Sequence, residues 1–172
     1  MGNCFECVVA PGVWPWPTSK QAAAAFCSDI IPPTPPAKID YGLLAVQVLL
    51  RRQRERLPGI LEELESHGRK QSHWAWWVFP TELPGAGEPG EATYVTEDTA
   101  CRLFHADAPS DDWRAVLEKL CALIEADGKL ILPRVDHGRV HHFLKFWSEV
   151  DSAPDWMQAI ITRLGCFDWP SR

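Results

Sequence analysis

The segment that most constrains the fold reads Gly68-Arg-Lys-Gln-Ser-His-Trp-Ala-Trp-Trp-Val-Phe-Pro80, and it holds three of the chain's 9 tryptophans within four positions. Ser72 is a suitable helix N-cap, and Pro80 cannot continue a helix because its nitrogen has no hydrogen to donate. Periodicity does not distinguish a helix from a strand in so short an apolar run. We favour a helix of about two turns between the serine and the proline.

Apolar residues recur at helical spacing on both sides of this segment. Before it, Asp40 is a plausible N-cap for a long helix with a solvated stretch at 51–56, which Pro58 breaks or restarts and which Gly68 ends. After it, a loop rich in glycine and proline spans 83–90. The helices expected beyond the loop span 96 to about 105, 110–127, about 139–150 and 154–165. Together they predict an all-α fold, a single compact domain of about five or six helices over residues 39–172.

Residues 1–38 differ in composition and hold nearly half of the chain's 15 prolines. Proline at this density blocks helix and sheet hydrogen bonding and favours an extended, polyproline-like path. We therefore interpret this segment as an irregular, proline-rich N-terminal arm or linker. The run Pro33-x-x-Pro36-x-Lys38 matches a polyproline ligand for the aromatic groove of a protein partner. A stiff spacer is the favoured interpretation.

The overall composition excludes several classes of protein. The formal net charge of the 172 residues is -6, and nucleic-acid binding needs a surplus of Lys and Arg, so we expect no general nucleic-acid binding. No apolar run reaches the ~18 residues of a membrane span. The first residues lack the basic start and apolar stretch of a secretory signal. These features predict a cytoplasmic protein whose 6 cysteines are thiols, and none of them implies a cofactor.

The first four residues raise the question of lipid attachment. Met1-Gly2-Asn3-Cys4 places a glycine for myristoylation beside a cysteine for palmitoylation, and lasting membrane attachment needs two such signals. Position 6 is Glu6 rather than the preferred Ser or Thr, so an ordinary initiator sequence is the alternative. Under the acylation hypothesis, Gly2 and Cys4 are the lipidation sites and the protein makes peripheral membrane contact through its N-terminus.

Residues 68–80 resemble the signature of the domain of unknown function 1810 family, which typically reads Gly-Arg-Lys-Arg-Ser-His-Trp, an aromatic-rich run and then Phe-Pro-Gln. The loop Gly85-Ala86-Gly87 before Tyr94, and the later Pro133-x-x-Asp136-x-x-Arg139, extend the resemblance over roughly residues 55–165. The resemblance implies an all-α fold and brings no established reaction. Two departures change the chemistry at the edge of a polar pocket. Thr81 replaces the family's Gln, and His141-His142-Phe143 stand where the family has Arg-Ser-Ser.

Cations and flat aromatic faces occur together in the same segment, where Arg69 and Lys70 precede His73 and the tryptophans. This combination suits an anionic ligand with a planar ring, such as a nucleotide, through charge-assisted hydrogen bonds and stacking. Asp136 and Arg139 would complete such a site on ribose or phosphate oxygens. The candidate ligand-binding residues are Arg69, Lys70, Trp74, Trp77, Asp136 and Arg139. The competing interpretation is that the tryptophans fill the core and the two cations stabilise the end of the preceding helix.

Two further questions concern catalysis and metal binding. His73 is the candidate catalytic residue if the ligand is hydrolysed, because histidine exchanges protons near neutral pH. His137 and His141 have the spacing of two zinc ligands on a helix but lack the glutamate of a metalloprotease motif. Cys4-x-x-Cys7 lacks a second cysteine pair, so no metal site is predicted. The alternative to a ligand-binding domain is a non-enzymatic interaction or scaffold module, tethered to a membrane by N-terminal acylation.

The acylation hypothesis is tested by replacing Gly2 with Ala, which removes the myristoylation acceptor and leaves the helical domain unchanged. Any membrane-bound fraction in eukaryotic cells is expected to become soluble. The measurement is the partition of both forms between membrane and soluble fractions, with the N-terminal mass as a control. Equal partition of the two forms, or an unmodified N-terminal mass, would contradict acylation.

Overall fold

The computed structural model of the chain describes residues 39–86 and 92–171. Residues 1–38, which include Gly2, Cys4 and the proline-rich run, lie outside the described residues, as do residues 87–91 and Arg172. Residues from Ile39 to the C-terminus group into one compact unit. Among the described residues, no helix combines the length and the apolar character needed to cross a membrane.

Helices dominate this unit, and the expectation of an all-α fold is confirmed. The two strands have two residues each and pair antiparallel, Gly85 with Thr93 and Ala86 with Ala92. The elements, in chain order, are α1 (Tyr41–His67), α2 (Ala75–Val78), β1 (Gly85–Ala86), β2 (Ala92–Thr93), α3 (Glu97–Ala100), the 3-10 turn η1 (Cys101–Phe104), α4 (Ser110–Asp127), the 3-10 turn η2 (Lys129–Ile131), α5 (Arg134–Glu149) and α6 (Asp155–Gly165).

Helix α1 begins and ends where the sequence predicts, but it is not interrupted at Pro58. The Leu43 N–H donates to Asp40 Oδ1 at 3.0 Å, and Gly68 ends the helix in the left-handed region with φ 64°. The predicted break at Pro58 is wrong, because the helix runs through this residue. Leu57 and Ile60 are buried on either side of it, so packing outweighs the one hydrogen bond that proline removes.

Two other helices differ from the prediction in length, and the helix expected from 96 to about 105 is instead the four-residue α3 followed by the 3-10 turn η1. Helix α2 is a single turn, and Ser72 does not cap it, because the Ser72 hydroxyl donates to Glu63 instead. Helix α5 begins at Arg134, five residues before the expected start near Arg139. Pro133 precedes its first turn with φ -56°, a value already close to that of a helix, and Asp136 places a favourable negative charge in that turn.

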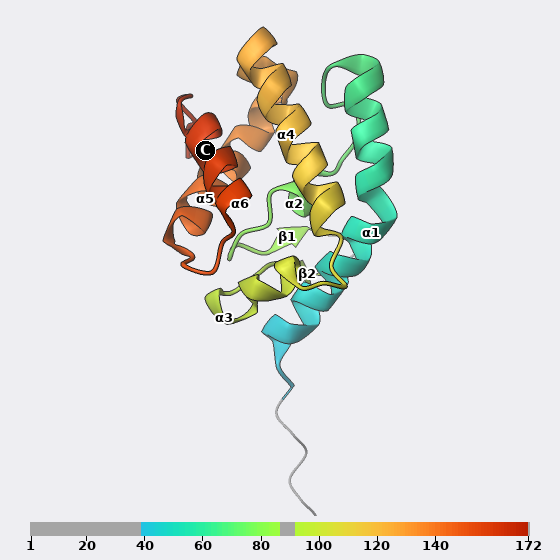
Figure 1. Cartoon of the computed structure of the whole chain (residues 1–172), viewed down its shortest axis with the longest axis vertical. Coiled ribbons are helices and arrows are strands. Elements are labelled where there is room, and N and C mark those ends of the chain that lie inside the picture. Colours follow the sequence, from blue (N-terminus) through green and yellow to red (C-terminus); the bar gives the residue numbers. More distant parts are fainter. Residues whose placement is uncertain (1–38, 87–91, 172) are drawn as a thin grey trace, which may run out of the picture. The chain divides into compact units, whose positions relative to one another are not determined.

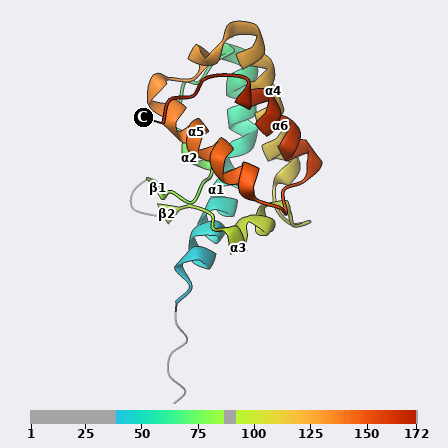
Figure 2. The same ribbon diagram turned by 90° about the vertical axis from the view of Figure 1, so that its left-hand side faces the viewer.

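The long helices pack around the α2 turn. Figure 1 shows α1 and α4 lying side by side, and α6 packs against both α4 and α5. Viewed from the side in Figure 2, the α2 turn lies close to α1 and α5.

An aromatic cluster with ring centroids 5.5 to 5.9 Å apart is formed by Phe104, Trp113, Trp147 and Trp156. Of the seven tryptophans among the described residues, five belong to the buried core and two pack against it.

Four consecutive carbonyl oxygens, those of residues 77–80, each accept a hydrogen bond from a side chain of a surrounding helix. We call these residues the carbonyl row. The donors, in chain order of the acceptors, are Gln53 Nε2 on α1, Trp113 Nε1 on α4, and Arg139 Nε and Trp147 Nε1 on α5, at 2.8 to 2.9 Å. Because the end of a helix leaves its last carbonyls without partners, these donors satisfy groups that burial would otherwise penalise.

Deleting residues 1–38 is expected to leave a cooperatively folding domain, because the described core packs on itself. The free energy of unfolding should change by less than about 1 kcal/mol, as measured by urea denaturation. Replacing Asp40 with Ala in the shortened chain gives a reference loss of stability, because removing an N-cap lowers the free energy of unfolding by about 1 kcal/mol. Loss of the cooperative transition on deletion would show that the arm belongs to the core.

Candidate functional site

A cleft of about 350 Å³ opens between the C-terminal half of α1 and the residues that lead into α2. Trp74 and Trp77 form its floor, and their exposed fractions are 1% and 4%. The other lining residues are Glu55, Arg56, Gly59 and Ile60 from α1, and Ser72 and His73 from the opposite wall. Gly59 has no side chain, and a Cβ added there would meet no atom within 4 Å, so this wall of the cleft is open.

The rim of the cleft is mostly polar and exposed. The guanidinium carbon of Arg56 lies 5.5 Å from the centroid of the Trp77 ring, a cation-π contact. Glu55 is offset by Arg52, with their charged atoms 3.5 Å apart. His73 is exposed at the same rim. The rim therefore offers an anion one guanidinium and one imidazole above an aromatic floor.

One polar group beside the cleft is unsatisfied. The indole nitrogen of Trp77 is buried and has no hydrogen-bond partner within the described structure. Its neighbour Trp74 differs, since Trp74 Nε1 donates to Glu63 Oε1 at 2.8 Å. Buried donors without a partner are uncommon in folded proteins, and one explanation of such a donor is an acceptor supplied by water or by a bound molecule.

Glu63 on α1 holds the wall of the cleft in place, and the sequence gives no sign of it. Its Oε1 accepts from the backbone N–H groups of Gln71 (2.7 Å) and Ser72 (3.2 Å) and from the Trp74 indole, and its Oε2 accepts from the Ser72 hydroxyl at 2.5 Å. Partial burial raises the pKa of Glu63, but these hydrogen bonds to the charged form outweigh burial, so the pKa lies below its ordinary value. The carboxylate thus fixes the residues on both sides of His73.

Lys70 and Asp136 meet, but as partners of each other. Lys70 Nζ lies 2.6 Å from Asp136 Oδ2, and the two side chains are 6% and 12% exposed. The Lys70 N–H also donates to the Ile131 carbonyl at 2.9 Å, and its ammonium lies 5.3 Å from the Trp74 ring centroid. This buried ion pair joins the residues after α1 to the first turn of α5, behind the floor of the cleft.

Arg139 lies in the core, on the other side of the α2 turn. Its Nε donates to the Phe79 carbonyl and its Nη1 to the Leu83 carbonyl, both at 2.8 Å, and its guanidinium carbon lies 5.0 Å from the Trp76 ring centroid. Burial lowers the pKa of Arg139 to about 10, and the nearby charge of Glu82 opposes that shift. Arg139 therefore remains a cation at neutral pH, and it joins α5 to the backbone that follows α2.

The structure thus separates the residues that the sequence groups together. His73, Trp74 and Trp77 line the cleft, joined there by Arg56, which the sequence treats as part of a solvated stretch. Lys70 and Asp136 pair behind the cleft, Arg139 lies in the core, and Arg69 is exposed next to the end of α1. Sequence reasoning missed the spacing of Arg56 and Ile60. The two residues are one helical turn apart, so the guanidinium and a buried apolar side chain point toward the same neighbour.

The two histidines with zinc-like spacing are engaged by backbone carbonyls. His137 Nε2 lies 3.2 Å from the Lys129 and Leu132 carbonyls, and His141 Nδ1 lies 3.0 Å from the Trp169 carbonyl. A carbonyl oxygen accepts but does not donate, so each of these ring nitrogens bears a hydrogen. Over the parts of the chain that the structure describes, no group of three or more metal-ligating side chains is found.

The family model described as protein of unknown function (DUF1810) matches residues 44–165, which include the cleft, the carbonyl row and Arg139. No curated protein and no solved structure matches the chain.

The role of Glu63 is tested by replacing it with Gln, which keeps the size but removes the charge that accepts four hydrogen bonds. The free energy of unfolding at pH 7 is expected to fall by about 1–3 kcal/mol. The folded-state pKa is depressed, so this contribution is complete above the unfolded-state value of 4.5 and is lost as pH falls through the lower folded-state pKa. The difference between the two proteins in urea denaturation should therefore shrink below pH 4.5.

Glu65 is the matched control, because it is an exposed glutamate on the same helix. Its replacement by Gln should change stability by less than about 0.5 kcal/mol at either pH. Equal effects of the two substitutions would show that Glu63 is not the residue that holds the wall of the cleft.

Proposed function

This chain belongs to the DUF1810 family of proteins of unknown function, and from that premise we propose that the cleft between α1 and residues 72–77 binds a small anion with a planar ring, such as a nucleotide. The observation that supports the proposal most directly is the Arg56 guanidinium, which lies over the Trp77 ring at the rim of the cleft. Nothing in the proposal requires Lys70 or Asp136, whose charges are already paired.

The anionic part of the ligand would face Arg56. Its side chain is exposed, and no carboxylate of the described residues forms an ion pair with it. A guanidinium offers several N–H donors in one plane, and it forms strong bidentate hydrogen bonds with phosphate or carboxylate oxygens. The exposed His73 imidazole at the opposite wall would add a second donor to the same group.

The planar part would stack on the exposed face of the same guanidinium. The Arg56 guanidinium carbon lies 5.5 Å from the centroid of the Trp77 ring, and a guanidinium also stacks on other aromatic rings. A ligand ring placed on the solvent side of the guanidinium would put Arg56 between two aromatic groups. The cleft volume of about 350 Å³ falls at the lower end of the range of small-molecule sites, which suits a single nucleotide.

Binding is a better-supported proposal than hydrolysis. His73 is the candidate acid or base, yet no hydrogen bond from the described residues orients its ring. General acid-base catalysis needs a group held within hydrogen-bond reach of the proton it transfers. We therefore propose that His73 contributes to binding, and we assign no reaction to the cleft.

The proposal is tested by calorimetric titration with AMP, ADP and ATP, with adenosine and inorganic phosphate as probes of the two halves of the ligand. A nucleotide is expected to bind more tightly than either half. Replacing Arg56 or His73 with Gln should weaken binding by about tenfold or more, equivalent to about 1.4 kcal/mol. Arg69→Gln is the control, since Arg69 is an exposed cation outside the cleft and its loss should change nothing.

A steric variant keeps the test independent of charge. Gly59 faces open space inside a helix, so Gly59→Leu should obstruct the cleft while the thermal midpoint is unchanged or higher. Nucleotide binding that survives Gly59→Leu would place the ligand elsewhere. Absence of binding by all five compounds would refute the proposal.

The interaction-module hypothesis keeps one supporting observation. Ile39, Tyr41 and Leu44, at and before the first turns of α1, are 66%, 68% and 51% exposed. Exposed apolar side chains that adjoin one another are typical of protein contacts. This alternative is favoured if the titration above finds no ligand.

A further inference from the structure

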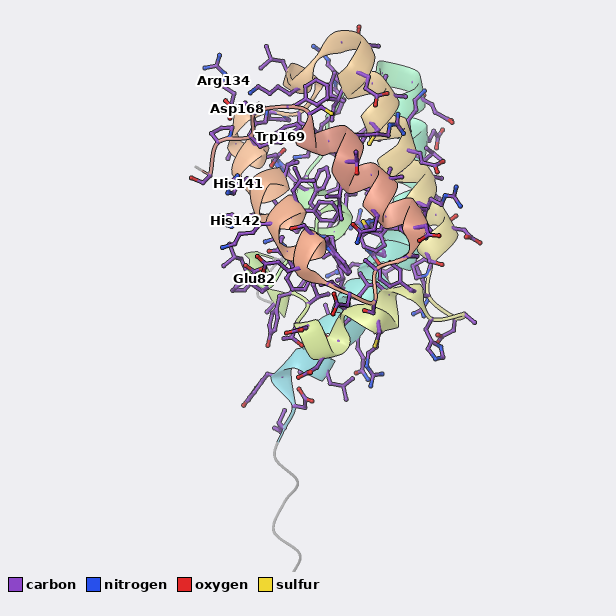
Figure 3. The ribbon with its side chains drawn as sticks, turned by 60° about the vertical axis from the view of Figure 1, so that its left-hand side comes forward. Glu82, Arg134, His141, His142, Asp168 and Trp169 are labelled. Carbon is purple, nitrogen blue, oxygen red and sulfur yellow. The ribbon has the colours of Figure 1, made fainter. Side chains whose placement is uncertain are left out.

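A second cavity of about 470 Å³ lies between α5, α6 and the residues that follow α6. Figure 3 shows the side chains of His141, Asp168 and Trp169 on the same side of the molecule, beside α5. The cavity is lined by residues of α5 and α6 and by residues 167–169 beyond α6. It shares no lining residue with the cleft on α1.

Apolar side chains form the floor of this cavity. Leu144, Ile161 and Phe167 are partly buried and pack against the hydrophobic core, and Trp169 is 6% exposed. A floor of this kind favours a ligand with an apolar body, because contact removes apolar surface of both partners from water.

The end wall of the cavity is held in a fixed position. Trp169 Nε1 donates to the Leu164 carbonyl at 2.8 Å, and the ring of His137 packs edge-on against the Trp169 ring, with centroids 5.2 Å apart. Lys129 Nζ donates to the Asp168 carbonyl. These contacts fix the backbone of residues 168 and 169, so the cavity does not need to form around its ligand.

His141 presents a hydrogen-bond acceptor when its ring is neutral. Its Nδ1 lies 3.0 Å from the Trp169 carbonyl, which only accepts, so Nδ1 bears the hydrogen. The lone pair of the neutral ring is then on Nε2, which can accept a hydrogen bond from a donor on the ligand.

The rim also bears one charge of each sign. Lys145 and Asp168 are exposed, and neither side chain forms an ion pair within the described residues. Lys145 lies one helical turn, about 6 Å, along α5 from His141. Asp168 precedes Trp169, whose carbonyl His141 bonds. A cation, an anion and a lone pair therefore belong to residues that line the same cavity.

We propose that this cavity binds a free α-amino acid with an apolar or aromatic side chain. The ligand carboxylate faces Lys145, and its ammonium faces the Asp168 carboxylate and His141 Nε2. Its side chain lies on Leu144, Ile161 and Phe167. An amino acid supplies adjacent charges of opposite sign beside an apolar body, which is the arrangement that this rim and floor complement.

The test is calorimetric titration of the full chain at pH 8 with phenylalanine and leucine, with glutamate as the polar control. Phenylalanine should bind more tightly than glutamate, whose side chain cannot use the apolar floor. Two single-charge analogues complete the series, 3-phenylpropionate without the ammonium and phenethylamine without the carboxylate. Each should bind at least about tenfold more weakly than phenylalanine. Equal binding of phenylalanine and either analogue would overturn the assignment of a zwitterion.

Variants then locate the site. Lys145→Met and Asp168→Asn should each weaken phenylalanine binding by about tenfold or more. His141→Asn retains an N–H for the Trp169 carbonyl but removes the Nε2 lone pair, so it should weaken binding with an unchanged thermal midpoint. Asp151→Asn is the control for lost acidic charge, because Asp151 is exposed and outside the cavity.

A blocking variant separates this proposal from the nucleotide proposal. Gly165 ends α6 at the cavity, and a Cβ there meets no atom within 4 Å, so Gly165→Leu should obstruct the cavity without unfolding the domain. Gly165→Leu should abolish phenylalanine binding and leave nucleotide binding intact, and Gly59→Leu should do the reverse. Phenylalanine binding unaffected by Gly165→Leu, or absent at millimolar concentration in the unmodified chain, would overturn the proposal.

Discussion

The carbonyl row at residues 77–80 is the constraint on which the rest of the structure depends. A one-turn helix cannot satisfy the carbonyls at its own end, and a buried acceptor without a partner costs about 1–3 kcal/mol. Side chains of α1, α4 and α5 supply the four missing donors. Because each donor belongs to a helix that also packs on the core, the row fixes the positions of three helices around one point. Tryptophan suits two of these contacts, since its ring fills the core while its N–H donates.

This use of the central segment limits what it offers to a ligand. Residues 68–80 contain cations and aromatic rings, but most of them are engaged by the fold. Lys70 is buried against Asp136, and removing either partner would leave an unpaired buried charge, at a cost of about 3–5 kcal/mol. The indole of Trp74 is bonded to Glu63. Arg69 is exposed at the end of α1, and the other accessible part of the segment is its outer edge at residues 71–73, which faces α1 where the cleft lies.

Sequence reasoning predicts the features that depend on neighbours along the chain. The cap at Asp40, the glycine that ends α1, the start of α4 at Ser110 and the all-α class are of this kind, and so is the family signature. The features it missed depend on contacts distant in sequence. Glu63 holds residues eight to eleven positions later, and Gln53 bonds a carbonyl 24 positions away, and neither has a local signal. The late start of α2 has the same origin, because Ser72 and Trp74, which precede it, bond to Glu63 on α1.

The ligands proposed for the two sites differ in net charge, and that difference determines how each site must select its ligand. The formal net charge of the chain is -6, so an anion approaching the α1 cleft meets overall repulsion, which physiological salt screens beyond about 8 Å. The rim supplies only one guanidinium and one imidazole to the anionic group, so stacking of a planar ring must supply much of the affinity. A simple phosphate should bind poorly for this reason. A zwitterion has no net charge and escapes the repulsion, so a zwitterion proposed for the α5–α6 cavity would be recognised by the opposite charges of Lys145 and Asp168 on its rim. Ionic strength should accordingly affect the two sites differently, since only the first binds a ligand with net charge.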